Sequence, residues 1–170
     1  MEHGMEEKEY LEVTAANAFC QAYSKLYRVN AAFDHINLPR KPDVTVCIDG
    51  TPQDIEIAHL YHDQQEAMRL KNLCLQSPSG VIMAAQSHHS NVPLLTDLVQ
   101  ALNELLTKKS TKSYQSHHPW LVIRNGSPKW DKRDFEIALR SIAVPKHHPF
   151  REIWVVPDLT ARQGLIRVYP

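Results

Sequence analysis

The alternating run between Asp43 and Ala58 limits the choice of fold more than any other part of the chain. Apolar residues recur at every second position on both sides of Asp49-Gly50, namely Val44, Val46, Ile48, Ile55 and Ile57. Such alternation is typical of half-buried strands, and Asp-Gly is a preferred pair in a two-residue type I′ turn. The segment therefore predicts a β-hairpin with one apolar face.

Apolar spacing elsewhere in the chain predicts helices and further strands. Residues spaced three and four apart indicate helices at 6–28, 64–76, 93–109 and 131–142. Apolar runs indicate strands at 119–124, 152–156 and 165–169, and residues 80–85 form either a short strand or part of a loop. This order predicts an α/β fold with a mixed central β-sheet flanked by helices. A length of 170 residues fits a single domain spanning 1–170.

The expected register of the hairpin brings two carboxylates together. If Asp49 and Gly50 are the central turn residues, Val44 faces Ile55 and Asp43 faces Glu56. Cross-strand neighbours have Cβ atoms about 4.5–5.5 Å apart, and two carboxylates that close repel unless a cation or a proton relieves them. Mg²⁺ and Mn²⁺ favour oxygen ligands and can activate water beside a phosphate. The hairpin thus predicts a metal site at Asp43 and Glu56.

The same residues resemble a known motif. Lys41-Pro42-Asp43-Val-Thr-Val, a short turn, and Asp54-Ile-Glu56-Ile-Ala58 are similar to the PD motif and the (D/E)xK strand of the PD-(D/E)xK nuclease superfamily. The resemblance extends over most of the chain, because the preceding helix and the later helices and strands also suit that family. It implies a restriction-endonuclease-like fold, metal ligation by Asp43 and Glu56, and hydrolysis of phosphodiester bonds in DNA. Resolvase-type members also use a glutamate on the first helix, which implies a role for Glu12, with Glu9 as the alternative.

One position departs from the family pattern. Ala58 stands where the family usually carries a catalytic lysine, and alanine cannot donate a hydrogen bond to an attacked phosphate. Two lysines are candidates to replace it. Lys41 would face Ala58 in the predicted register, and Lys71 could reach back from the next helix.

A second function remains open, in which the chain keeps the fold without catalysis and binds a protein or a nucleic acid. Ala58 favours this alternative, and so does the charge balance, with 19 basic and 19 acidic residues. Any basic surface must be local, as at Lys108, Lys109 and Lys112, although lysines at a helix end are usually explained by solvation and the helix dipole. Because resolvase-like proteins often dimerise, a homodimer is also an expectation.

Other classes of protein find little support in the sequence. No apolar stretch approaches the roughly 18 residues of a spanning helix and the first residues do not resemble a secretory signal, so we expect a cytoplasmic protein without a membrane partner. Three cysteines without C-x-x-C spacing are expected to be buried free thiols. The ten histidines lack zinc-site spacing and are expected in loops, with one of them lining the site. Trp130, beside Lys129, is a candidate for contacting a base or a partner.

Overall fold

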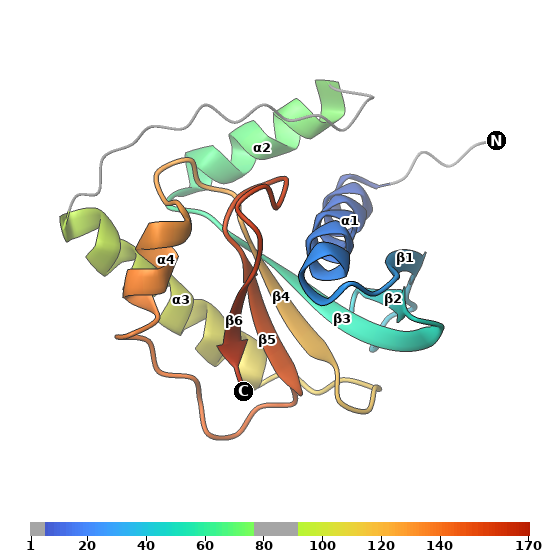
Figure 1. Ribbon diagram of the computed structural model, residues 1–170. Helices are drawn as coiled ribbons and strands as arrows, with labels where there is room; N and C mark the ends of the chain where they lie inside the picture. The colour runs from blue at the N-terminus through green and yellow to red at the C-terminus, as the bar shows by residue number, and fades with distance from the viewer. Residues whose placement is uncertain (1–5, 77–91) are drawn as a thin grey trace.

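The computed structural model describes residues 6–76 and 92–170, and the segment 80–85 lies outside this part (Figure 1). The described residues form helices and strands in this order: α1 (Glu7–Tyr27), β1 (Ala31–Ile36), β2 (Val44–Ile48), β3 (Thr51–Leu60), α2 (Gln64–Gln76), α3 (Val92–Ser110), β4 (Trp120–Asn125), α4 (Lys132–Ala138), β5 (Glu152–Val156) and β6 (Ile166–Tyr169). In the described part of the chain, no helix is long and apolar enough to cross a membrane.

The six strands form one mixed sheet in the order β1-β2-β3-β4-β5-β6. The first three strands are antiparallel, β3, β4 and β5 are parallel, and β6 returns antiparallel to β5. Parallel neighbours need a crossover connection, and α4 lies on the crossover from β4 to β5. The predicted α/β class with a mixed sheet flanked by helices is therefore confirmed.

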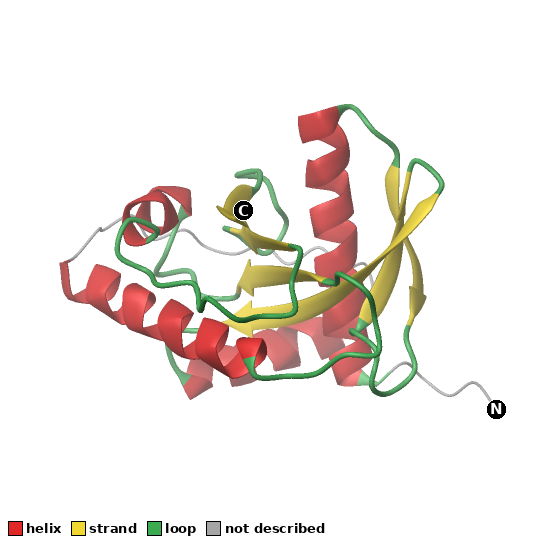
Figure 2. Ribbon diagram, turned by 90° about the horizontal axis from the view of Figure 1, so that it is seen from below, coloured by secondary structure: helices red, strands yellow, loops and turns green. Residues whose placement is uncertain are grey.

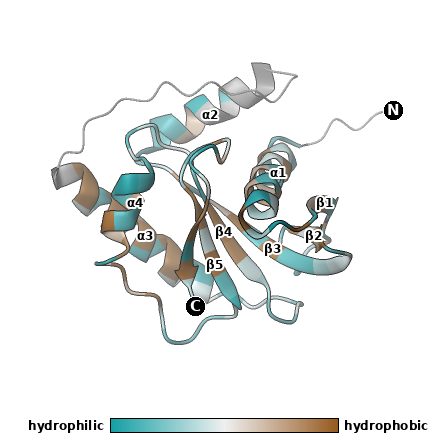
Figure 3. Cartoon of the chain, viewed as in Figure 1, coloured by the Kyte–Doolittle hydropathy of each residue, from teal (hydrophilic) through white to brown (hydrophobic). Residues whose placement is uncertain are grey.

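Helices cover both faces of this sheet (Figures 1 and 2). On one face, Ala15, Ala16 and Phe19 of α1 pack in a buried cluster with Val44 and Trp154. On the other face, α3 and α4 bury a second cluster that contains Leu98, Leu102, Leu106, Phe135, Leu121 and Ile153. Figure 3 shows hydrophobic residues along the central strands and α3, as expected for parallel strands covered on both sides.

The hairpin forms as predicted from Val44 and Ile55 to the turn, but the expected pairing of Asp43 with Glu56 is not part of the register, because Asp43 precedes β2. Asp49 and Gly50 have φ values of 47° and 82°, which are the positive values of a type I′ turn, and Val44 pairs with Ile55. Because β2 begins at Val44 and β3 continues to Leu60, β2 does not cover the last part of this edge of β3.

Two expectations, one about Lys41 and one about Trp130, need correction. The predicted pairing of Lys41 with Ala58 does not form, because the chain turns before β2: the Lys41 N–H donates to the carbonyl of Leu38. Trp130 is not available to a partner, since it is buried and its Nε1 donates to the Leu94 carbonyl at 2.9 Å. Trp130 is therefore a core residue whose ring is packed among apolar side chains and whose N–H has a hydrogen-bond partner.

One strand was missed, and one helix is shorter than predicted. β1 was not predicted, because its apolar residues do not alternate cleanly. The fourth helix ends at Ala138 instead of 142 and continues only as turns.

Candidate functional site

A cavity of about 170 Å³ lies beside β3, beyond the first residue of β2. It is lined by residues of α1, of the segment before β2, of β3 and of the end of α3 and the residues after it, namely Lys8, Leu11, Glu12, Asp43, Glu56, Ile57, His59, Lys109 and Lys112. A larger cavity of about 510 Å³ shares Lys8, Glu12, Asp43, Glu56 and Lys112 with it, so the two cavities adjoin at these side chains. The three predicted carboxylates, Glu12, Asp43 and Glu56, therefore line one site.

Asp43 is held beside the uncovered edge of β3. Its Oδ2 accepts the N–H of Ile57 at 2.9 Å, a bond that takes the place of strand pairing there. Its own carbonyl accepts the N–H of Asn37 at 2.9 Å, which secures the backbone before β2. Burial, and then the negative charge of Glu56, raise the pKa of Asp43. The two acids of the predicted pair thus act on each other electrostatically.

A network of short hydrogen bonds on the polar face of the hairpin supports this arrangement. Thr45 Oγ1 lies 2.6 Å from Asp54 Oδ1 and 2.9 Å from Asn37 Oδ1, and Ser116 donates to Asp54 Oδ2 at 2.6 Å. Burial opposes ionisation of Asp54, but the bonds from Ser116 and Thr45 outweigh it and lower its pKa. The network joins the segments before β2 and before β4 to the hairpin and so fixes two walls of the site.

Glu12 reaches the cavity from the buried face of α1. Its Oε1 lies 3.0 Å from Lys8 Nζ, which is also 3.7 Å from Asp43 Oδ1. Burial and then the charge of Asp43 raise the pKa of Glu12 to about 7, although Lys8 partly offsets them. Glu12 can therefore gain or lose a proton near neutral pH, as a general acid or base must.

Two lysines bind Glu56, one in the last turn of α3 and the other just after the helix. Lys109 Nζ lies 2.6 Å from Glu56 Oε1 and 3.3 Å from the Ile57 carbonyl oxygen, and Lys112 Nζ lies 3.3 Å from Glu56 Oε1. Burial disfavours the charged form of Glu56, but the hydrogen bond and charge of Lys109 overcome it and lower the pKa. Glu56 is therefore a carboxylate with a nearly buried ammonium partner.

The lysines proposed from the sequence occupy other positions. Lys41 lines the larger cavity, where its charge acts on Asp54. The side chain of Lys71 lies outside the described residues. Ala58 belongs to the buried cluster under α3, so that cluster, and not the cavity, receives its side chain. Lys109 was noted in the sequence only as part of a basic group, because its spacing does not reveal that the end of α3 returns to β3.

The site is balanced in formal charge. Three carboxylates and three lysines line the smaller cavity, namely Glu12, Asp43 and Glu56 with Lys8, Lys109 and Lys112. Burying carboxylates without counter-charges is costly, so the lysines explain how the acids are retained. The carboxylate oxygens suit a hard divalent cation, but a cation at Glu56 would compete with Lys109.

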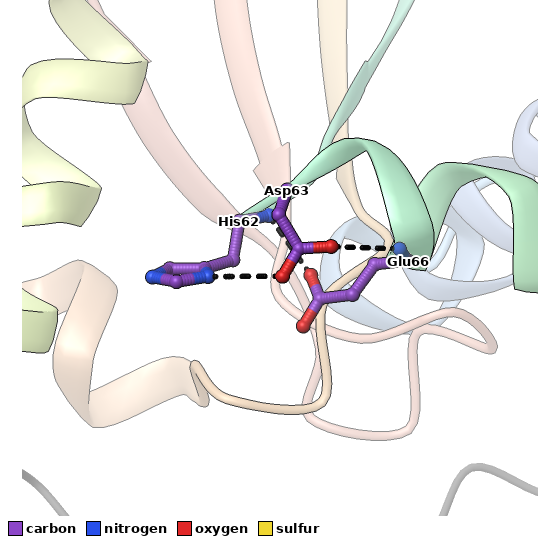
Figure 4. Close-up of side chains that lie close together, drawn as sticks. All are labelled: His62, Asp63 and Glu66. Carbon is purple, nitrogen blue, oxygen red and sulfur yellow. Dashed lines mark hydrogen bonds and ion pairs between the residues drawn. The ribbon is translucent and has the colours of Figure 1, made fainter.

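A second group of potential metal ligands lies at the start of α2 (Figure 4). Among the described residues, His62, Asp63 and Glu66 form the set whose ligand atoms all lie within 4.8 Å of one another, whereas the three site carboxylates do not form such a set. Asp63 accepts the N–H of Glu66, and Glu66 accepts the N–H of His62, each at 2.9 Å. Lys129 Nζ lies 2.9 Å from His62 Nδ1 and 3.4 Å from Asp63 Oδ2. The bonds that cap the start of α2 and the nearby Lys129 ammonium therefore explain why these three side chains lie together without a metal ion.

The fold and the cavity together define the chain as an α/β protein with a mixed sheet and a cavity lined by carboxylates and lysines. Comparison of the chain with protein-family models, with curated proteins and with solved structures found no match. Its function must therefore be inferred from its own residues.

Proposed function

We propose that this protein is a metal-dependent nuclease-like hydrolase that cleaves phosphodiester bonds of DNA, with a restriction-endonuclease-like fold. The observation that carries the proposal is the position of Lys109, whose Nζ lies 2.6 Å from Glu56 in the cavity that Asp43 and Glu12 also line. A lysine from α3 thus supplies the donor that Ala58 lacks. The segment resembling the PD-(D/E)xK motif carries both of the acids.

The side chains divide the chemistry among them. Asp43 and Glu56 would hold Mg²⁺ or Mn²⁺, which when bound supplies positive charge to the phosphate and lowers the pKa of an attacking water. Lys109 is placed to donate to the phosphate oxygen on which negative charge develops. Glu12, with a pKa of about 7, is suited to accept a proton from the attacking water.

The charge balance of the site favours a second candidate function, a binding module without catalysis. The three lysines neutralise the three carboxylates without a metal ion, and Lys109 and Lys112 both form ion pairs with Glu56. In a protein that had lost its metal, such ion pairs would stabilise the former site. The same fold would then act by binding a protein or nucleic-acid partner.

Metal binding and DNA cleavage separate the two functions. We expect the wild type to bind Mn²⁺ by calorimetry and to nick supercoiled plasmid, and Asp43→Asn or Glu56→Gln to lose both activities. Lys109→Met should retain the metal but lower the cleavage rate at least 100-fold, since one donor to a developing oxyanion contributes about 10²–10³. Lys108→Met, an exposed neighbour on the same helix, is the matched control and should cleave like wild type. A wild type that binds no Mn²⁺ and cleaves no DNA would establish the binding role instead.

A further inference from the structure

The loop that connects β1 to β2 forms part of the wall of the larger cavity. Residues 37–42 all line that cavity, which adjoins the carboxylates of the proposed active site. The side chain of Asn37 donates to the Pro42 carbonyl at 2.9 Å, and the N–H of Gln115, after α3, donates to the Arg40 carbonyl at 2.8 Å. These bonds close the loop on itself and fix it to the segment that follows α3.

The loop contains a tight turn with an arginine at a position that favours glycine. The N–H of Lys41 donates to the Leu38 carbonyl at 3.3 Å, which places Pro39 and Arg40 at the centre of a four-residue turn. Arg40 has a φ of 76°, a positive value of the kind that the third residue of a type II turn requires. Glycine is the usual residue there, because a side chain is strained in this conformation. The loop therefore keeps an arginine where the backbone alone would favour glycine.

The guanidinium of Arg40 makes no polar contact that would explain its presence. Its side chain is exposed and forms no hydrogen bond or ion pair with the other described residues, and the same is true of Lys41. Residues 37–42 contain these two cations and no acid. Strained backbone positions are concentrated at active sites and at sites that hold a ligand. The loop thus presents two unpaired positive charges to the cavity.

We propose that the loop 37–42 binds the DNA strand that is cleaved, with the Arg40 guanidinium on a backbone phosphate that flanks the scissile one. The inference rests on the proposed DNA substrate and names a part of the site that binds it. A guanidinium suits this role, because it is always charged and its planar donors match the oxygens of a phosphate. A small phosphodiester has no flanking phosphate and would not use this contact.

Replacing Arg40 by glycine separates DNA binding from folding. Arg40→Gly removes the side chain and relieves the backbone, so urea unfolding should find it no less stable than the wild type. Binding of a short fluorescein-labelled DNA duplex is measured by anisotropy with Mn²⁺, in the slowly cleaving Lys109→Met background. The affinity should fall about tenfold, which is the contribution of a hydrogen bond to a charged group. The slope of log affinity against log salt concentration should fall by about 1.

Two further variants show whether the side chain or the backbone is responsible. Arg40→Gln keeps the strained position and should give the same loss of affinity. Arg28→Gly is the matched control, because Arg28 is also an exposed arginine with a positive φ of 56° but lines neither cavity. Arg28 caps the C-terminus of α1, where the helix dipole favours a positive charge. Its replacement should leave DNA affinity and the salt slope unchanged.

Hydrolysis of bis(p-nitrophenyl) phosphate tests the contact from the side of the substrate. Arg40→Gly should hydrolyse this small diester like the wild type, whereas its KM for DNA should rise. In a wild type that cleaves DNA, equal DNA affinity of Arg40→Gly, or an equal loss of activity on the small diester, overturns the loop contact and leaves the catalysis standing. Binding that depends on Arg40 in a wild type that cleaves no DNA supports the contact and overturns the catalysis. A wild type that neither binds nor cleaves DNA overturns both proposals.

Discussion

Glu12 is buried where its negative charge is disfavoured, so its ionisation should weaken the fold. Its pKa rises from 4.5 to about 7 on folding, so the folded protein holds a proton between these values that the unfolded chain has released. Stability should therefore fall as pH rises from about 4.5 to about 7. The rise in the pKa of Glu12 already includes the opposing effect of Lys8, and one pKa unit corresponds to about 1.4 kcal/mol. Glu12→Gln should therefore stabilise the fold by about 2–3 kcal/mol at pH 8.

Urea unfolding of this variant at pH 4.5 and pH 8 measures the effect, which should be near zero at the lower pH. Glu136→Gln, on the exposed side of α4, is the control and should change little at either pH. Equal effects of Glu12→Gln at both pH values would show that the charge of Glu12 is not the cause.

The site residues differ in how well the sequence could reveal them. Asp43 and Glu56 could be predicted to lie near each other, because turn chemistry sets the register of the hairpin as far as Val44 and Ile55, although the bond of Asp43 to the Ile57 N–H could not be predicted. Glu12 could be found because a glutamate on an apolar helix face needs a partner. Lys109 and His59 could not be assigned, since one depends on where α3 ends in space and the other on where β2 stops covering β3.

At the scale of elements, the hairpin turn requires a positive φ angle at Gly50. Its φ of +82° lies in the left-handed region, and a Cβ added there would meet no atom within 4 Å. Any cost of Gly50→Ala is therefore backbone strain, which we expect to be about 1 kcal/mol. Gly50→Asn should cost less, because asparagine tolerates this conformation. Urea unfolding of both variants provides the measurement, and an equal loss in the two would point to a cause other than the turn.

Helices and strands with strong local patterns were predicted closely, whereas weakly patterned ones were not. The second helix and the strand at 152–156 have the predicted bounds, because their apolar spacing is regular and their flanks are polar. β1 was missed because pairing with β2, and not its own sequence, makes it a strand. The pairing of parallel strands also lies beyond local pattern, since it depends on the path of each crossover.

At the scale of the molecule, buried Arg124 joins three parts of the chain. From β4 it donates to the Leu159 carbonyl at 2.6 Å and 3.0 Å, and to Thr14 Oγ1 of α1 at 3.0 Å. Arg124→Met should destabilise by roughly 2–4 kcal/mol, because it leaves buried acceptors without donors. Thermal unfolding measures this, with exposed Arg133→Met as a control that should be nearly neutral. A loss below about 1 kcal/mol would mean that other groups replace these bonds.

The acids and the lysines of the cavity come from different parts of the sequence, so they do not become available at the same time while the chain is being synthesised. All three carboxylates and Lys8 precede residue 57, whereas Lys109 and Lys112 come 53 and 56 residues after Glu56. While the chain is being synthesised, its first 60 residues carry three acids of the site and one of their three lysines. Since burying charged carboxylates without counter-charges is costly, we expect this part of the hairpin to stay open to water until the ribosome has released the end of α3.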